Sequence, residues 1–157
     1  MRSSGLPSAL SAPPASPEEA AFRAYVAQLL EERPDVEFVV LFGSRARGTW
    51  LPSSDFDLLV GLGGDDGLRL TDRIGQLTQS MRANVDLFPY SRSEWEHMFA
   101  DRHPLLLEAL DSGQILFDRG SFAAMRRTFE EWLRTGKVAR WHNGWRIMDE
   151  PTTGSVP

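Results

Sequence analysis

Three aspartates, Asp55, Asp57 and Asp86, carry the most distinctive chemistry of this 157-residue sequence. Asp55 and Asp57 are two residues apart at the start of an apolar, strand-like segment, so their side chains should project from the same face of a sheet. Two carboxylates held side by side repel each other unless a cation or water separates them, and hard oxygen ligands suit Mg²⁺. The pair therefore predicts a metal site, although an isolated Asp-x-Asp pair more often faces solvent.

Asp86 adds a third carboxylate within residues 84–88, a short apolar segment in which an unpaired charge is costly to bury. A neighbouring metal ion would offset that cost. If this segment lies beside the strand of Asp57, the three aspartates form a cup for two metal ions roughly 4 Å apart, the arrangement that clamps an in-line phosphoryl displacement. The alternative is a half-exposed strand aspartate without a ligand role.

A turn that suits phosphate binding precedes the aspartates. Gly43 and Ser44 directly follow an apolar run, where exposed backbone N–H groups and a hydroxyl can contact phosphate oxygens. Arg47 would lie one helical turn after Ser44 and could reach the same anion. The segment is not a P-loop, because Thr49 and Trp50 occupy the positions where that motif requires Lys and Ser or Thr. An ordinary turn remains the alternative.

The elements expected around these residues form an α/β (α+β) fold with a short mixed β-sheet and flanking helices. Strands are predicted at residues 36–42, 56–60 and 85–88, with an edge strand at 115–117. Helices are predicted to begin near residues 16, 70, 91, 104 and 121. Pro89 is expected to end the third strand, the second helix to continue to Met81, and the last helix to bury Leu133.

Composition narrows the class of protein. The net charge of -5 argues against stable nucleic-acid binding through contacts with the phosphate backbone. The absence of cysteine excludes disulfides, zinc-thiolate sites and thiol nucleophiles. Residues 1–15 are expected to be a disordered tail, residues 16–136 the folded domain, and residues 137–157 a C-terminal tail that packs on the domain or a partner. Because no signal peptide or membrane span is apparent, we expect a cytoplasmic protein.

Together, Gly43-Ser44, Arg47, Asp55-x-Asp57 and a later strand aspartate resemble the DNA polymerase beta-like nucleotidyltransferase superfamily, and within it the minimal nucleotidyltransferases. The resemblance covers roughly residues 36–118. It implies a polymerase beta-like core, ATP or another NTP as donor, and two Mg²⁺ ions held by the three aspartates. It further implies that Gly43 and Ser44 bind the triphosphate, with Arg47 nearby.

The acceptor is a separate question. Many minimal nucleotidyltransferases resemble antitoxins that adenylylate a tyrosine of a partner HEPN-domain toxin, so the resemblance implies transfer of an NMP, first of all AMP, to a partner protein. Residues 137–148 favour this interpretation, because tryptophan and arginine are enriched where proteins meet. Two alternatives remain: a small-molecule transferase of the aminoglycoside-modifying kind, and a catalytically silent module that binds a partner.

Overall fold

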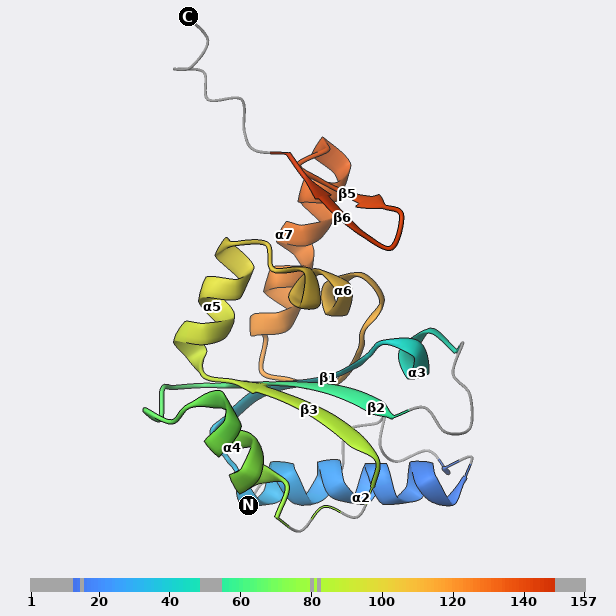
Figure 1. The fold of residues 1–157 in the computed structure, drawn as a ribbon, viewed down its shortest axis with the longest axis vertical. Helices are drawn as coiled ribbons and strands as arrows, with labels where there is room; N and C mark the ends of the chain where they lie inside the picture. Colours follow the sequence, from blue (N-terminus) through green and yellow to red (C-terminus); the bar gives the residue numbers. More distant parts are fainter. Residues whose placement is uncertain (1–12, 15, 49–54, 80, 82, 149–157) are drawn as a thin grey trace, which may run out of the picture.

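A central sheet separates two layers of helices in the computed structural model of the chain (Figure 1). The structure describes residues 13–14, 16–48, 55–79, 81 and 83–148. Most of the predicted N-terminal tail, together with residues 149–157, therefore lies outside the described residues. Thr49 and Trp50, which excluded the P-loop, lie outside them as well.

The sheet is mixed, as the sequence predicts. In chain order the elements are α2 (Pro17–Glu32), β1 (Val36–Phe42), α3 (Ser44–Arg47), β2 (Phe56–Leu62), α4 (Leu70–Leu77), β3 (Val85–Tyr90), α5 (Arg92–Ala100), α6 (Pro104–Ser112), β4 (Gln114–Asp118), α7 (Ser121–Thr135), β5 (Val138–Trp141) and β6 (Gly144–Ile147). The strand order is β3-β2-β1-β4, with β1 antiparallel to β2 and β4, and β2 parallel to β3. The parallel pair needs a crossover, which α4 supplies. The predicted fold class is confirmed.

Local sequence fixes the starts of two helices. The Ser16 Oγ accepts a hydrogen bond from the backbone N–H of Glu19 at 3.1 Å, and Pro17 occupies the first helical position of α2. At α5, the backbone N–H of Ser91 donates to the Glu94 carboxylate at 2.8 Å as part of a capping box. These contacts satisfy backbone donors that have no partner inside the helix, which is why both helices begin where predicted.

Both faces of the sheet are covered by apolar packing. Val39 and Leu58 belong to the cluster on the side of α2 and α4, whereas the adjacent Val40 and Leu59 belong to the cluster on the side of α5, α6 and α7. Strands β1 and β2 are accordingly buried along almost their whole length. A strand covered on both faces has a nearly continuous apolar sequence, which made these two strands recognisable.

Several element boundaries differ from the prediction, and two of the differences have a clear physical reason. Strand β3 continues through Pro89 to Tyr90, because β3 is at the edge of the sheet, where a proline is tolerated. Helix α4 ends at Leu77 instead of continuing to Met81. At its end the backbone N–H and the hydroxyl of Thr78 both donate to the Ile74 carbonyl, at 3.0 and 2.8 Å, and such side-chain bonding competes with helix continuation.

The prediction for the end of α7 is also wrong in one respect. Phe122, Met125 and Phe129 are buried as expected, but Leu133 is 39% exposed. Figure 1 shows the reason: the last turns of α7 extend beyond the layer that packs on the sheet. None of the helices within the described ranges is long and apolar enough to cross a membrane.

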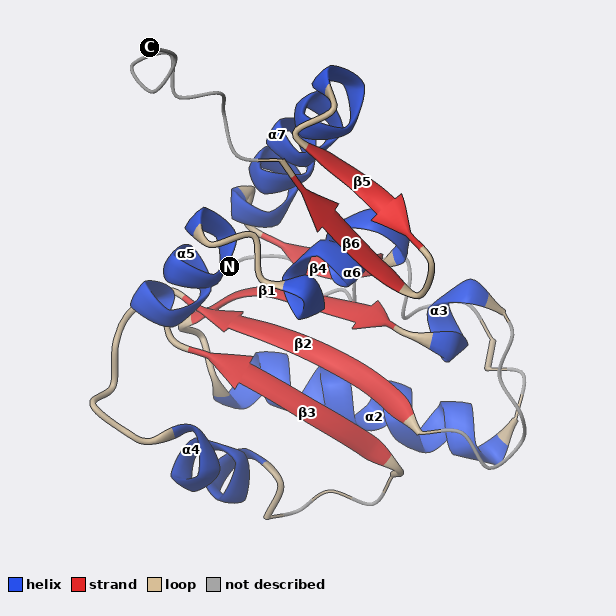
Figure 2. Cartoon of the chain, turned by 45° about the horizontal axis from the view of Figure 1, so that its top comes forward, coloured by secondary structure: helices blue, strands red, loops and turns tan. Residues whose placement is uncertain are grey.

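The C-terminal region forms a hairpin that the sequence analysis did not predict. Strands β5 and β6 pair in antiparallel fashion, with Arg140 opposite Trp145. Val138 is fully buried, and the Trp145 ring meets the Phe129 ring of α7 edge-on at 5.6 Å between centroids. The hairpin lies against α7 and α6, and its turn points toward α3 (Figure 2). The hairpin is therefore stabilised by packing on these helices, and its own sequence lacks an apolar pattern that would predict it.

Candidate active site

Asp57 and Asp86 are neighbours across the parallel pair of strands. They are register partners, each the second residue of its strand, on β2 and β3. Their strand neighbours Phe56 and Val85 point into the cluster on the side of α2 and α4. The alternation of side chains along a strand therefore places both carboxylates on the opposite face of the sheet. Two of the three predicted site aspartates are thus brought together.

Negative charge is concentrated around Asp57. The pKa of this half-buried carboxyl is raised above its ordinary value, first by burial and then by the charges of Asp86 and Asp55, whereas the charge of Arg47 acts in the opposite direction. Asp86 and Asp55 are exposed. A cation that binds beside such a carboxylate stabilises its charged form.

Gly43 lies directly against the Asp57 carboxylate. Strand β1 pairs with β2 so that Phe42 is opposite Asp57, and Gly43 follows with a φ of 78°. A Cβ atom at Gly43 would overlap the Asp57 Oδ2 atom and lie 3.2 Å from the Asp57 Cγ atom. Only glycine fits here, because both the backbone conformation and the space exclude a side chain. The turn of Gly43 and Ser44 is therefore adjacent to the carboxylate pair.

Helix α3 carries two arginines with different surroundings. The Arg45 guanidinium lies 4.1 Å from the centroid of the Phe56 ring. Arg47 is exposed, and its Nη1 atom donates to the Glu108 Oε2 atom of α6 at 3.2 Å. Its charge still acts on Asp57. Arg47 is thus at the edge of the site, but its partner Glu108 is 61 residues away, which sequence spacing could not reveal.

The three aspartates do not form the closed cup that the sequence suggested. Within the described ranges, no three Asp, Glu or His side chains are grouped as ligands of one ion. Asp55 precedes the first residue of β2, so the strand alternation that would align it with Asp57 does not reach it. The pair Asp57 and Asp86 nevertheless fits a divalent cation, because it offers oxygen ligands with like charge and Gly43 keeps one side of Asp57 free of any side chain.

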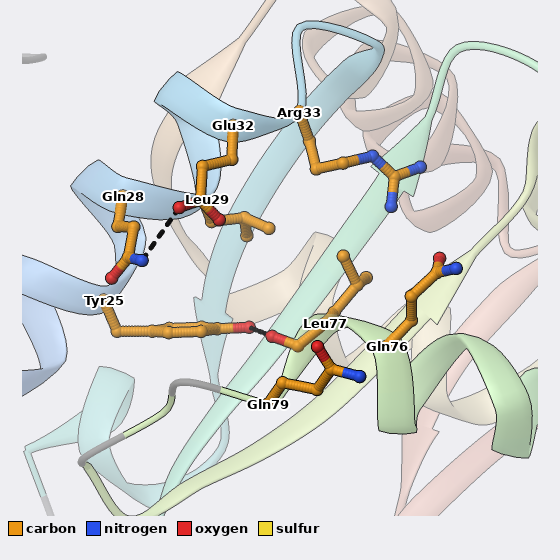
Figure 3. Close-up of a pocket in the computed structure, with 8 residues that line it drawn as sticks. All are labelled: Tyr25, Gln28, Leu29, Glu32, Arg33, Gln76, Leu77 and Gln79. Atoms are coloured by element: carbon orange, nitrogen blue, oxygen red, sulfur yellow. Dashed lines mark hydrogen bonds between the residues drawn. The ribbon is translucent and has the colours of Figure 1, made fainter.

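A pocket also lies on the other side of the sheet. A cavity of about 590 Å³ opens between α2 and α4, and the side chains of Gln28, Gln76 and Gln79 help to line it (Figure 3). Tyr25 closes part of it by donating its hydroxyl to the Leu77 carbonyl at 2.8 Å. This cavity is on the side of α2 and α4, away from the face that carries Asp57 and Asp86. We therefore do not assign it to the catalytic chemistry.

The sequence matches a family model described as nucleotidyltransferase domain over residues 23–108, more than half of the chain. The chain therefore belongs to the nucleotidyltransferase family, and the predicted superfamily and enzyme class are confirmed. The matched region contains all six predicted site residues. No curated protein matches the sequence.

The chain matches solved structures, among them the following three. A predicted nucleotidyltransferase from Sulfolobus solfataricus is 25% identical, with 64% of this chain and 79% of that chain covered and a TM-score of 0.49. A chain of a toxin–antitoxin complex with AMP-PNP is 18% identical, with coverages of 73% and 88% and a TM-score of 0.50. A chain of a tri-AMPylated Shewanella oneidensis HEPN toxin in complex with MNT antitoxin is 16% identical, with coverages of 76% and 92% and a TM-score of 0.45. The toxin–antitoxin chain with AMP-PNP supports a shared fold.

Proposed function

We propose that this nucleotidyltransferase moves AMP from ATP to a hydroxyl group of a partner protein, with Mg²⁺ at the aspartates. One observation carries the proposal: Asp57 is in register with Asp86 and in contact with Gly43, so the carboxylate pair and the phosphate turn meet at one point. Bound Mg²⁺ would supply charge neutralisation on the phosphates and a lower pKa of the acceptor hydroxyl. A cytoplasmic location is part of this proposal, as expected for an enzyme that uses ATP as donor.

The residues of the chain then have separate roles. Asp57 and Asp86 would hold the metal, with Asp55 completing the ligand set for a second ion. The Gly43 backbone and the Ser44 hydroxyl would bind the triphosphate, and Arg47 would neutralise part of its charge. These contacts would position the α-phosphorus for in-line attack. Positioning and neutralisation of charge together account for most of the rate enhancement in phosphoryl transfer.

The covalent step joins the acceptor oxygen to the α-phosphorus and breaks the bond to pyrophosphate, which leaves. The acceptor proton passes to a nearby base. Asp86 is suited to accept it, because it lies exposed on the edge strand β3, where an incoming acceptor can approach. An exposed edge is open to a large acceptor, whereas a small molecule normally binds in an enclosed pocket.

The proposed acceptor is a HEPN-like toxin protein. Two features support a protein acceptor: the resemblance of the Gly-Ser and Asp-x-Asp motifs to those of antitoxin-type enzymes, and an exposed aromatic surface on the hairpin. There Trp141 is 49% exposed, and the Arg146 guanidinium lies 3.7 Å from the centroid of its ring. Tryptophan and arginine of this kind are enriched in binding hot spots.

The proposal can be tested by incubating the chain with α-labelled ATP, Mg²⁺ and a HEPN-domain protein encoded beside it. We expect label on the partner, no label with Asp57→Ala, and reduced use of ATP with Ser44→Ala. Labelling of aminoglycosides without labelling of the protein would replace the protein acceptor by a small molecule. A stable complex with the partner but no transfer to any acceptor would identify a silent binding module.

A further inference from the structure

Glu108 is shared by two arginines from distant parts of the chain. Its Oε2 atom accepts from Arg47 Nη1 at 3.2 Å, and its Oε1 atom accepts from Arg140 Nη1 at 2.9 Å. Arg47 belongs to α3 beside the carboxylate pair, whereas Arg140 belongs to β5 of the hairpin. One carboxylate of α6 therefore connects the edge of the candidate site with the C-terminal hairpin.

The two arginines are held very differently. Arg140 also donates to the Asp111 Oδ2 atom at 2.6 Å and lies 4.0 Å from the centroid of the Trp145 ring. The hydrogen bonds to Glu108 and then Asp111 raise the pKa of Arg140 above its ordinary value. Arg140 is thus held by three neighbours, Glu108, Asp111 and Trp145, of which only Glu108 also contacts Arg47.

Arg47 has a looser attachment. Its ion pair with Glu108 is the longer of the two, at 3.2 Å against 2.9 Å, although the side chains of Arg47 and Arg140 are almost equally exposed, at 42% and 41%. A guanidinium has five N–H donors, and a triphosphate is a stronger competitor for them than a single carboxylate that already neutralises another arginine. Arg47 can therefore move from Glu108 to a bound nucleotide at small cost.

We propose that Glu108 competes with the nucleotide for Arg47: it holds Arg47 at the edge of the site, and Arg140 weakens that hold by taking up part of the negative charge of Glu108. This inference rests on the proposed contact of Arg47 with the triphosphate. It links the hairpin to nucleotide affinity, since a change at Arg140 alters how readily Arg47 is released.

The signs of the effects follow from the charges. Removing the charge of Glu108 frees Arg47, so Glu108→Gln should tighten ATP binding. Removing the charge of Arg140 leaves Glu108 with Arg47 alone, so Arg140→Gln should weaken it. Partly exposed ion pairs are weak, so we expect roughly two- to fivefold changes in the dissociation constant in each direction. Arg47→Gln should weaken binding by about tenfold or more.

Calorimetric titration of the full chain with ATP in the presence of Mg²⁺ measures these constants. Double mutants distinguish an effect of Glu108 on ATP affinity that acts through Arg47 from a general effect of the changed charge. If Glu108 acts through Arg47, Glu108→Gln should have no effect in the Arg47→Gln background. If Arg140 acts through Glu108, Arg140→Gln should have no effect in the Glu108→Gln background. A general electrostatic effect would instead be additive in both backgrounds.

Glu131→Gln provides a matched control, because it removes the same charge from the exposed ion pair with Arg134 on α7. It should leave ATP affinity unchanged, and thermal melting of every variant checks that the fold is retained. Additive effects, or equal directions for Glu108→Gln and Arg140→Gln, would overturn the inference alone. Unchanged ATP affinity in Arg47→Gln, or no ATP binding by the wild type, would overturn the proposed nucleotide site and this inference with it.

Discussion

Asp57 of β2 and Asp86 of β3 face each other in register across the one parallel strand pair described in this sheet. Strand pairing thus sets two negative charges at adjacent positions, and burial adds to the cost of charging Asp57. Such an arrangement opposes folding unless a cation offsets it, which is typical of residues kept for function. The same pair therefore bears on both stability and catalysis.

Asp57→Asn should abolish nucleotidyl transfer and stabilise the fold at neutral pH. Because the pKa of Asp57 is raised in the folded protein, the folded state binds a proton more readily than the unfolded chain does. The wild type should therefore lose stability as the pH rises from about 4 through the raised pKa, and the variant should lack this loss. Thermal melts at acidic and neutral pH, with transfer assays, measure both effects. Full transfer activity in the variant would exclude Asp57 as a catalytic ligand.

Gly43→Ala and Gly48→Ala compare two glycines with positive φ. Gly48, at φ 76° and ψ 13°, is in the left-handed helical region, where Ala should cost about 1 kcal/mol. Gly43, at φ 78° and ψ -156°, has a backbone conformation that is essentially limited to glycine, so Ala should cost more there. Only at Gly43 would the new Cβ overlap the Asp57 carboxylate, whereas at Gly48 it meets nothing within 4 Å. We expect both a larger loss of stability and a much larger fall of kcat in Gly43→Ala, with kcat almost unchanged in Gly48→Ala. Equal kcat values would show that the contact with Asp57 has no catalytic importance.

The two hairpin tryptophans should behave differently. Trp141 is exposed, so Trp141→Ala should weaken labelling of the partner protein while leaving ATP affinity and the melting temperature almost unchanged. Trp145 packs against Phe129 and beneath Arg140, so Trp145→Ala should destabilise the fold by up to about 3 kcal/mol. Partner labelling, ATP titration and thermal melts separate the two cases. Unimpaired labelling in Trp141→Ala would remove this face from the acceptor interface.

Arg73 should be the main polar contributor to stability. Its side chain is 1% exposed and donates to the Asp66 carboxylate at 2.8 and 2.7 Å and to Glu94 at 2.8 Å. Arg73→Met should cost about 1.5–3 kcal/mol, because the carboxylates of Asp66 and Glu94 lose their cation but are 24% and 38% exposed, so water partly replaces it. Denaturant unfolding measures this loss. A loss below about 1 kcal/mol would show that solvent replaces the arginine.

The same network predicts a pH dependence. The hydrogen bonds from Arg73 hold the pKa of Asp66 well below its ordinary value. The resulting stability is present above the ordinary carboxyl pKa and is lost as the pH falls toward the lowered one. Asp66→Asn should therefore be less stable than the wild type at neutral pH, and the difference should shrink in acid. A difference independent of pH would contradict this.

Local sequence was sufficient for much of this protein. The cap at Ser16, the capping box of Ser91 and Glu94, and the buried strands could be predicted, because each depends on neighbouring residues or on burial of a whole segment. The motifs around Gly43 and Asp57 were likewise sufficient to predict the family, since they are short and lie at fixed spacing.

Tertiary structure alone decided the rest. The contact of Arg47 with Glu108 joins residues 61 positions apart, and the ion pair of Arg140 with the same carboxylate depends on how the hairpin packs on α6. The register that places Asp57 opposite Asp86 depends on how β2 and β3 align, which no periodicity within one strand can specify. Such contacts arise from the folding of distant segments onto one another, and a local pattern carries no record of them.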